Sequence, residues 1–243
     1  MSKAQLAAMP DRERTLLILV AHASNEINVL EKLILMTSAG TPPEKFVDHV
    51  EAAQTLIVLR LLIGKLNETW RLFSTRFQSV AGLPQTYLPR LTSKAQDDLA
   101  WLRRYFGREN RISGIRNQFA FHTPDDDVIE AAFQDLGETE PWTFYLSDLS
   151  GNTFYYAAEM VITRAIAQSA GPASDDILAS ELAAVFDDTI AVSRKIKDLF
   201  SELIALICEQ HLASGEPIEG VQLEVPRLPY VPFFLDEDSL KGK

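Results

Sequence analysis

Three polar residues near the middle of the chain could together bind or cleave a phosphodiester. They are Arg116, Asn117 and His122, which lie within seven positions of one another. A guanidinium offers a fixed set of donors that suits phosphate oxygens. An imidazole can accept and return a proton near neutral pH. With RNA as the substrate, the imidazole would take the proton of a 2′-hydroxyl or protonate the leaving oxygen, and the guanidinium would stabilise the charge that builds on phosphorus.

The spacing of these residues limits how one helix can present them. If residues 111–122 are helical, six steps separate Arg116 from His122 by about 9 Å along the axis and about 120° around it. One undistorted helix therefore directs the two side chains poorly to a single phosphate. Two copies related by a two-fold axis could supply a pair of each residue to one cleft. A distorted helix end is the alternative, and Gly114 before the motif and Thr123-Pro124 after it would allow one.

This pattern, an Arg-Asn pair followed by His122, resembles the Arg-(x4–6)-His motif of the HEPN superfamily, in which Asn often follows the Arg. The resemblance implies an all-α bundle that forms a homodimer and acts as a metal-independent endoribonuclease or as an RNA-binding protein. It also implies a role in toxin–antitoxin or phage-defence systems, with an antitoxin or another protein as partner. By this resemblance Arg116 and His122 are the catalytic pair and Asn117 orients them, and no cofactor or metal is expected.

A second polar group lies in the first long helical segment, residues 11–38. His22 and Glu26 are one turn apart and share an arc with several apolar residues, so we expect them to lie within the bundle. They could satisfy each other as a pair, or they could face a polar site together with Asn25. The resemblance allows either Glu26 or His22 to support the catalytic pair. A metal site here would lack an evident third ligand.

The distribution of charge leaves two functional interpretations open. The chain has a net charge of −11, from 23 basic and 34 acidic residues, which is unusual for a protein that binds nucleic acid. Between Arg90 and Arg116, however, seven basic residues face only three acidic ones. Candidate RNA-binding residues in this window are Arg103, Arg104, Arg108 and Arg111, although a solvated, salt-bridged surface would look the same. The acidic remainder favours the alternative function, a non-enzymatic helical module for protein–protein interaction.

Apolar residues at helical spacing, interrupted by proline, predict an antiparallel bundle of long helices that forms one domain, residues 1–213. Within residues 59–80 apolar residues alternate at steps of four and three, which predicts packing along another helix. Other expected helices cover residues 92–107, 111–122, 125–136, 157–170 and 174–211. Aromatic residues near 142–155 make a small β-hairpin a candidate.

The last part of the chain, residues 214–243, is proline-rich, which predicts an extended arm. Its apolar stretch Tyr230–Phe234 would favour aggregation if exposed, so we expect it to dock on the bundle. The apolar runs are too short to span a membrane. A single cysteine, Cys208, and the lack of an export segment lead us to expect a cytoplasmic protein that does not enter membranes.

Overall fold

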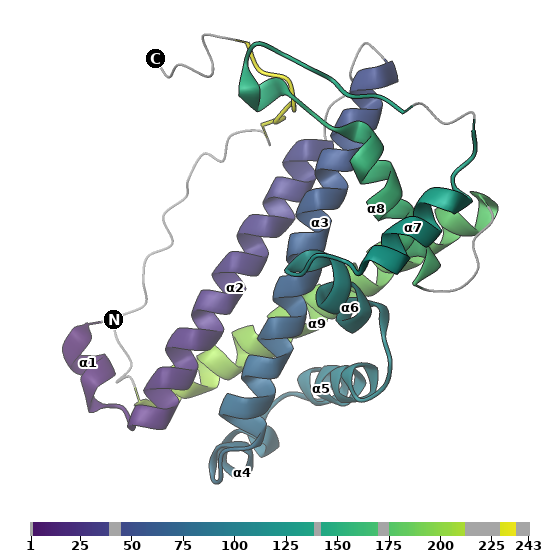
Figure 1. Ribbon diagram of the computed structural model, residues 1–243. Coiled ribbons are helices and arrows are strands. Elements are labelled where there is room, and N and C mark those ends of the chain that lie inside the picture. The colour runs from purple at the N-terminus through teal and green to yellow at the C-terminus, as the bar shows by residue number, and fades with distance from the viewer. Residues whose placement is uncertain (1, 39–44, 139–141, 170–174, 212–228, 237–243) are drawn as a thin grey trace. The chain divides into compact units, whose positions relative to one another are not determined.

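The structure is a computed structural model that describes residues 2–38, 45–138, 142–169, 175–211 and 229–236 of the 243-residue chain (Figure 1). The described residues form helices and no β-strand, so the predicted all-α class is confirmed. None of the helices in these residues is both long enough and apolar enough to cross a membrane.

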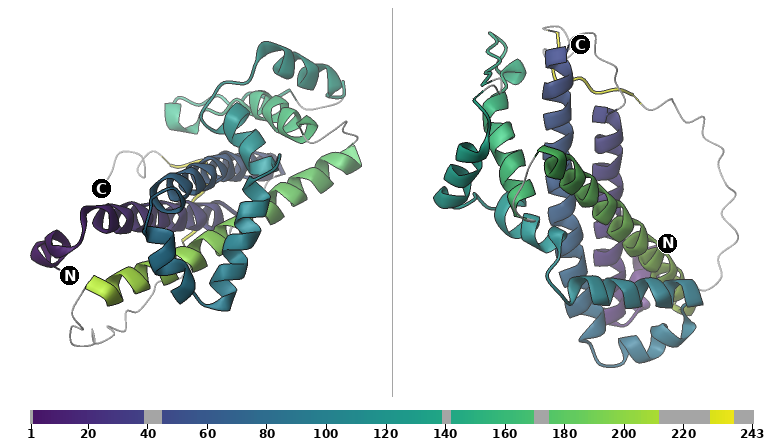
Figure 2. Two further views of the ribbon diagram at one scale, coloured as in Figure 1. Left: turned by 90° about the horizontal axis from the view of Figure 1, so that it is seen from below. Right: turned by 90° about the vertical axis from the view of Figure 1, so that its right-hand side faces the viewer.

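Three long helices carry most of the fold. They are α2 (Asp11–Ser38), α3 (Lys45–Phe73) and α9 (Asp175–His211). The bounds of α2 agree with the predicted segment, residues 11–38. Figures 1 and 2 show α2 and α3 side by side. The apolar stripe of α3 is buried at the predicted spacing of four and three residues, as at Leu59, Ile63 and Leu66.

Shorter elements connect the long helices. Four were expected from the sequence, namely α5 (Ser93–Phe106), α6 (Arg111–Ile115), α7 (Asp126–Asp135) and α8 (Tyr156–Gln168). Two short helices were not expected, α1 (Lys3–Ala8) and α4 (Leu83–Tyr87). There are also two π-helical turns, η1 (Ser74–Gln78) and η3 (Arg116–Ala120), and two 3₁₀ turns, η2 (Leu88–Arg90) and η4 (Ser150–Asn152).

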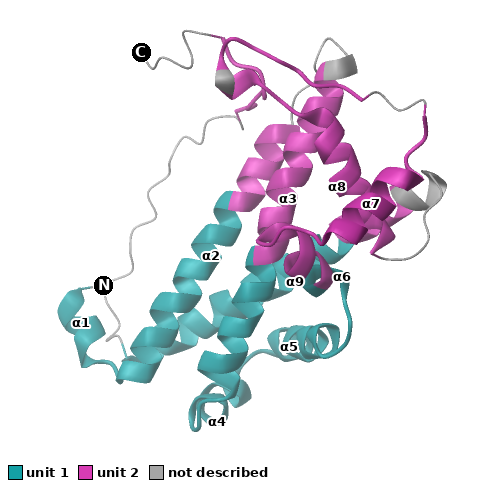
Figure 3. Ribbon diagram, in the orientation of Figure 1, with its two compact units in different colours: residues 1–29, 65–113, 187–225 teal, residues 30–64, 114–186, 226–243 magenta. Residues whose placement is uncertain are grey.

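The chain divides into two compact units (Figure 3). Unit 1 comprises residues 1–29, 65–113 and 187–225, and unit 2 comprises residues 30–64, 114–186 and 226–243. The helices α2, α3 and α9 contribute residues to both units. The predicted border between bundle and arm, at residues 213 and 214, lies outside the described residues.

Unit 1 has an aromatic core and a buried polar cluster. The ring of Phe73 lies 4.9 Å from that of Phe77 and 5.5 Å from that of Phe200, measured between centroids. The hydroxyl of Tyr87, a fully buried residue, donates to the carboxylate of Glu13, which also contacts Nε2 of His211. This polar cluster joins the first turn of α2, the short helix α4 and the last turn of α9.

Unit 2 contains the docked end of the arm. Tyr145 and Phe154 pair through one antiparallel bridge, with two hydrogen bonds of 2.8 Å, so the candidate hairpin is reduced to a single bridge. Phe154 forms a buried cluster with Val50 and Ala53, against which Phe233 and Phe234 pack. The expected docking of the arm is therefore seen for its described residues.

Asn152 holds the arm through two hydrogen bonds. Its Nδ2 donates to the carbonyl oxygen of Leu235 at 2.6 Å, and its Oδ1 accepts from the backbone N–H of Leu235 at 2.9 Å. A third bond, of 3.0 Å, runs from the N–H of Val231 to the carbonyl oxygen of Met36. Because one buried side chain makes both bonds to Leu235, the position of this residue depends on Asn152.

We predict that Asn152→Ala detaches the arm without unfolding the chain. Each lost hydrogen bond contributes about 0.5–1.5 kcal/mol, so the docked state should lose about 1–3 kcal/mol. Hydrogen exchange at the amides of Val231 and Leu235 should accelerate, while exchange in α5 stays unchanged. Asp148→Ala, at a nearby exposed carboxylate, is the control, and equal exchange in both variants would contradict the prediction.

Candidate functional site

The Arg-Asn-x4-His motif begins on a π-helical turn. The sequence predicts one helix over residues 111–122, but the structure has α6 up to Ile115 and then η3 over Arg116–Ala120. Helical geometry ends at Phe121, where φ is −129° and ψ is 2°. A π turn closes hydrogen bonds five residues apart instead of four, and such turns are frequent at functional sites. The angular separation expected for an undistorted helix therefore does not apply to this motif.

Two apolar side chains, one before the motif and one within it, anchor this turn. Ile115 and Phe119 are buried, while Arg116 between them is half-buried and Asn117 is exposed. The buried pair fixes the orientation of the turn. The two polar side chains are thereby held at the edge of the buried surface.

The end of the turn lies unusually close to α3 at Gly64. A Cβ atom built on Gly64 would lie 2.5 Å from Cε2 of Phe121 and 2.9 Å from Cβ of Ala120. Because real Cβ atoms essentially never lie within 3.0 Å of another heavy atom, a side chain at this position would require α3 or the neighbouring segment to move. The lack of a side chain at Gly64 therefore allows Ala120 and Phe121, which lie between Arg116 and His122, to pack against α3.

The structure brings Arg116 and Asn117 together. Nη1 of Arg116 donates to Oδ1 of Asn117 at 3.0 Å, which restricts the guanidinium. His122 is exposed and follows the turn by two residues. Within the described part of the chain, this hydrogen bond joins Arg116 to Asn117, and no hydrogen bond between Arg116 and His122 is found. The arrangement thus offers a partly oriented guanidinium and a solvent-accessible imidazole.

His22 and Glu26 pair with each other, which was one of the two arrangements expected from the sequence. Nε2 of His22 lies 3.1 Å from Oε2 of Glu26, and Nζ of Lys65 contacts the same oxygen. His22 does not lie within the bundle, because 66% of its side chain is exposed, and Ile18 on the same arc is also exposed. Glu26 is only partly exposed, because Lys65 of α3 lies beside it. His22 and Glu26 belong to unit 1, and the motif belongs to unit 2.

The candidate RNA-binding arginines belong to unit 1 and differ in their surroundings. Nε of Arg103 donates to Gln78 at 2.8 Å, and Nη1 of Arg111 lies 3.6 Å from the carboxylate of Asp188. Arg104 and Arg108 are exposed. Both interpretations of the basic window therefore apply in part, since some of its cations are paired and others face water.

An exposed aromatic surface in unit 2 was not identified from the sequence. The rings of Phe133 and Trp142 are 5.2 Å apart, and those of Phe144 and Tyr155 are 5.7 Å apart. All four residues are exposed, as is Leu146. The aromatic residues after Trp142 are the signal for this surface in the sequence, where they make a β-hairpin a candidate.

Comparison of the chain with protein-family models, with curated proteins and with solved structures finds no match.

Proposed function

We propose that this protein is a HEPN-like, metal-independent endoribonuclease or RNA-binding protein that uses Arg116, Asn117 and His122. The observation that carries the proposal is the placement of this motif on a π turn, where Asn117 holds the guanidinium of Arg116 and His122 is open to solvent. A role in a toxin–antitoxin or phage-defence system in the cytoplasm, with an antitoxin as partner, extends the same proposal.

The proposed reaction cleaves RNA by internal transfer. The 2′-oxygen attacks phosphorus, its proton passes to an imidazole, and the bond between phosphorus and the 5′-oxygen breaks as that oxygen is protonated. The products are a 2′,3′-cyclic phosphate and a 5′-hydroxyl. Arg116 would stabilise the charge on the phosphoryl oxygens. A homodimer would place a second His122 at the same phosphate, so that one imidazole removes a proton and the other supplies one.

The test is cleavage of single-stranded RNA by the full chain in the presence of EDTA. We expect the wild-type chain to cleave, and His122→Ala and Arg116→Ala to lower the rate about 10²- to 10⁴-fold, the usual contribution of an acid–base group. Arg194→Ala, at an exposed arginine of α9, should cleave like the wild type. Absence of cleavage by the wild type would contradict the enzymatic form of the proposal.

The RNA-binding form of the proposal has its own readout. If the wild type binds a labelled RNA without cutting it, Arg116→Ala should weaken binding and Arg194→Ala should not. Equal binding by all variants, or no binding at all, would contradict this form as well.

The alternative function is that of a non-enzymatic interaction module. The observation that favours it is the exposed aromatic surface of unit 2, which includes Phe144 and Tyr155. Exposed aromatic clusters are enriched at protein interfaces. The docked aromatic residues of the arm, Phe233 and Phe234, do not support this function because they pack within unit 2. Phe144→Ser should then abolish capture of a partner while leaving RNA cleavage unchanged.

A further inference from the structure

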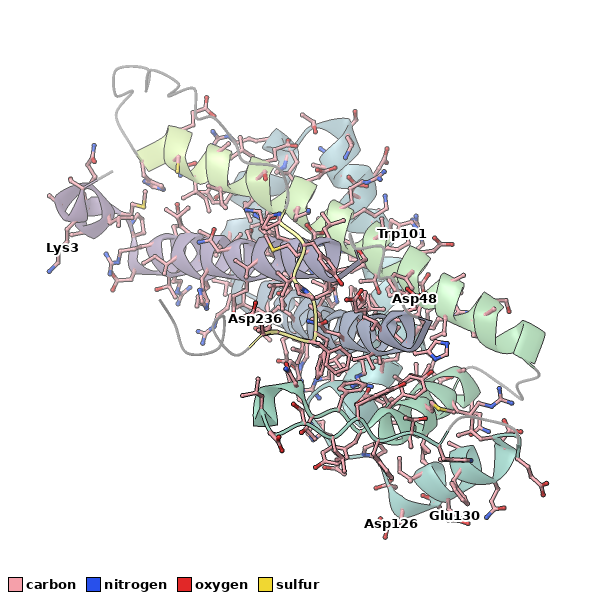
Figure 4. All side chains as sticks on the ribbon, turned by 90° about the horizontal axis from the view of Figure 1, so that it is seen from above. Lys3, Asp48, Trp101, Asp126, Glu130 and Asp236 are labelled. Carbon is pink, nitrogen blue, oxygen red and sulfur yellow. The ribbon has the colours of Figure 1, made fainter. Side chains whose placement is uncertain are left out.

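A cavity of ≈ 360 Å³ in unit 2 is independent of the motif described above. It lies between the end of α2 and the first half of α3, and Phe186 of α9 contributes to its wall. Its polar lining consists of two carboxylates, Asp48 and Glu51, and of three hydroxyl groups. Figure 4 labels Asp48 near the start of α3.

One oxygen of the Glu51 carboxylate is buried and lacks a hydrogen bond within the described residues. The residue is only 5% exposed, and Oε1 receives no hydrogen bond in the described part of the chain. Asp48 precedes it by three positions and thus lies on the same face of α3. Burial, followed by the charge of Asp48, raises the pKa of the Glu51 carboxyl above its ordinary value of 4.5. A buried, unsatisfied carboxylate beside a second one is unfavourable unless a donor is supplied.

The hydroxyl groups of the cavity cannot supply that donor, because their protons are used elsewhere. The hydroxyl of Thr55 donates to Oγ1 of Thr37 at 3.1 Å. The hydroxyl of Thr37 donates to the carbonyl oxygen of Leu33 at 3.0 Å, and that of Ser38 to the carbonyl oxygen of Ile34 at 2.9 Å. Each hydroxyl oxygen therefore presents only lone pairs to the cavity. Among the described residues, the polar side chains that line the cavity therefore present only hydrogen-bond acceptors, two of them carboxylates.

We propose that this cavity binds a small organic cation with N–H donors, a primary alkylammonium, whose charged end meets Glu51 and Asp48. A lining whose described polar side chains offer only acceptors and negative charge disfavours anions and fits an ammonium group, which has three donors and no acceptor. Ala52, Leu56 and Phe186 provide an apolar wall for the hydrocarbon part. Within the described residues no group of three or more His, Cys, Asp or Glu could hold a metal ion, which favours the organic cation.

The test uses n-butylammonium chloride as the probe and the full chain as the receptor. We expect saturable binding by calorimetry at millimolar concentration, a rise in the thermal midpoint, and NMR shift changes in residues 33–38 and 48–56. The neutral n-butanol and the donor-free tetramethylammonium ion should produce none of these effects. Glu51→Gln should weaken binding about ten- to hundredfold, which corresponds to loss of a charge-assisted hydrogen bond.

Two further variants keep the test decisive. Thr55→Val removes a lone-pair acceptor and should also weaken binding, whereas Asp97→Asn, at an exposed carboxylate of α5, should bind like the wild type.

Affinity should also fall as the pH is lowered through the raised pKa of Glu51, because a protonated carboxyl no longer attracts the cation. The titratable neighbour that faces Glu51 is Asp48. Equal affinity of wild type and Glu51→Gln, or no saturable binding by the wild type, would overturn the proposal. Neither result depends on cleavage of RNA.

Discussion

Gly64→Ala is expected to destabilise unit 2 and to displace the motif. The new Cβ would lie 2.5 Å from the ring of Phe121 and 2.9 Å from Cβ of Ala120, so either α3 or the segment after η3 must move. Overpacking of this kind usually costs about 1–3 kcal/mol. Urea unfolding should show the loss of stability. If the proposed function holds, RNA cleavage should fall as well, since His122 follows Phe121 directly.

Gly114→Ala is the matched control for this prediction. Gly114 is also a helical glycine, in α6, but a Cβ built on it has no atom within 4 Å. Alanine loses less backbone entropy on folding than glycine, so this variant should be more stable by about 0.5–1 kcal/mol. If both variants lost stability equally, the change would reflect helix propensity or the general effect of mutation, and the close approach at Gly64 would not explain it.

Glu13→Ala is expected to produce the largest loss of stability in unit 1. The carboxylate of Glu13 accepts from the buried hydroxyl of Tyr87 and contacts His211, so its removal takes away the close acceptor of Tyr87 and leaves the hydroxyl only a 3.5 Å contact with Nε2 of His211. Each buried donor without a partner costs about 1–3 kcal/mol. Burial and the bond to Glu13 raise the pKa of Tyr87, so the phenol stays protonated and needs its acceptor at every ordinary pH. Thermal unfolding and hydrogen exchange in α4 should both report the change.

Two comparisons separate the buried cluster from ordinary charge effects. Glu13→Gln retains one acceptor oxygen and should lose less stability than Glu13→Ala. Glu209→Ala removes an exposed partner of Arg90 at 3.0 Å and should change stability by less than about 1 kcal/mol. A small effect of Glu13→Ala, comparable to that of Glu209→Ala, would mean that water replaces the carboxylate at Tyr87.

Helix positions could be predicted from the sequence because local interactions determine them. Thr92 caps α5 by accepting from the N–H of Ala95, as its position before an apolar stripe indicates. The π turn of η3 could not be predicted in this way, since the end of this turn packs against Gly64, which is far away in the sequence. The exposure of His22 was missed for the same reason. Periodicity shows which arc of a helix is apolar, but it does not show whether another helix covers that arc.

The candidate sites show the same limit. The residues of the Arg-Asn-x4-His motif are close in sequence, so a local pattern identified them. The hydrogen bond between Thr55 and Thr37 joins two helices, and the acceptor-only lining of the cavity depends on it. No local pattern around Glu51 predicts that the nearby hydroxyl protons are used elsewhere. Such a site becomes visible only when the donors and acceptors of the folded chain are counted.

The docked arm affects how the association of this chain should be measured. Phe233 and Phe234 cover the apolar cluster around Val50, and Asn152 binds the backbone beside them. A chain shortened to residue 213 would leave that cluster uncovered, and uncovered apolar surface tends to self-associate. A dimer observed only after such truncation would reflect adhesion of the newly exposed surface. Subunit stoichiometry should therefore be determined by sedimentation or light scattering on chains that keep all 243 residues.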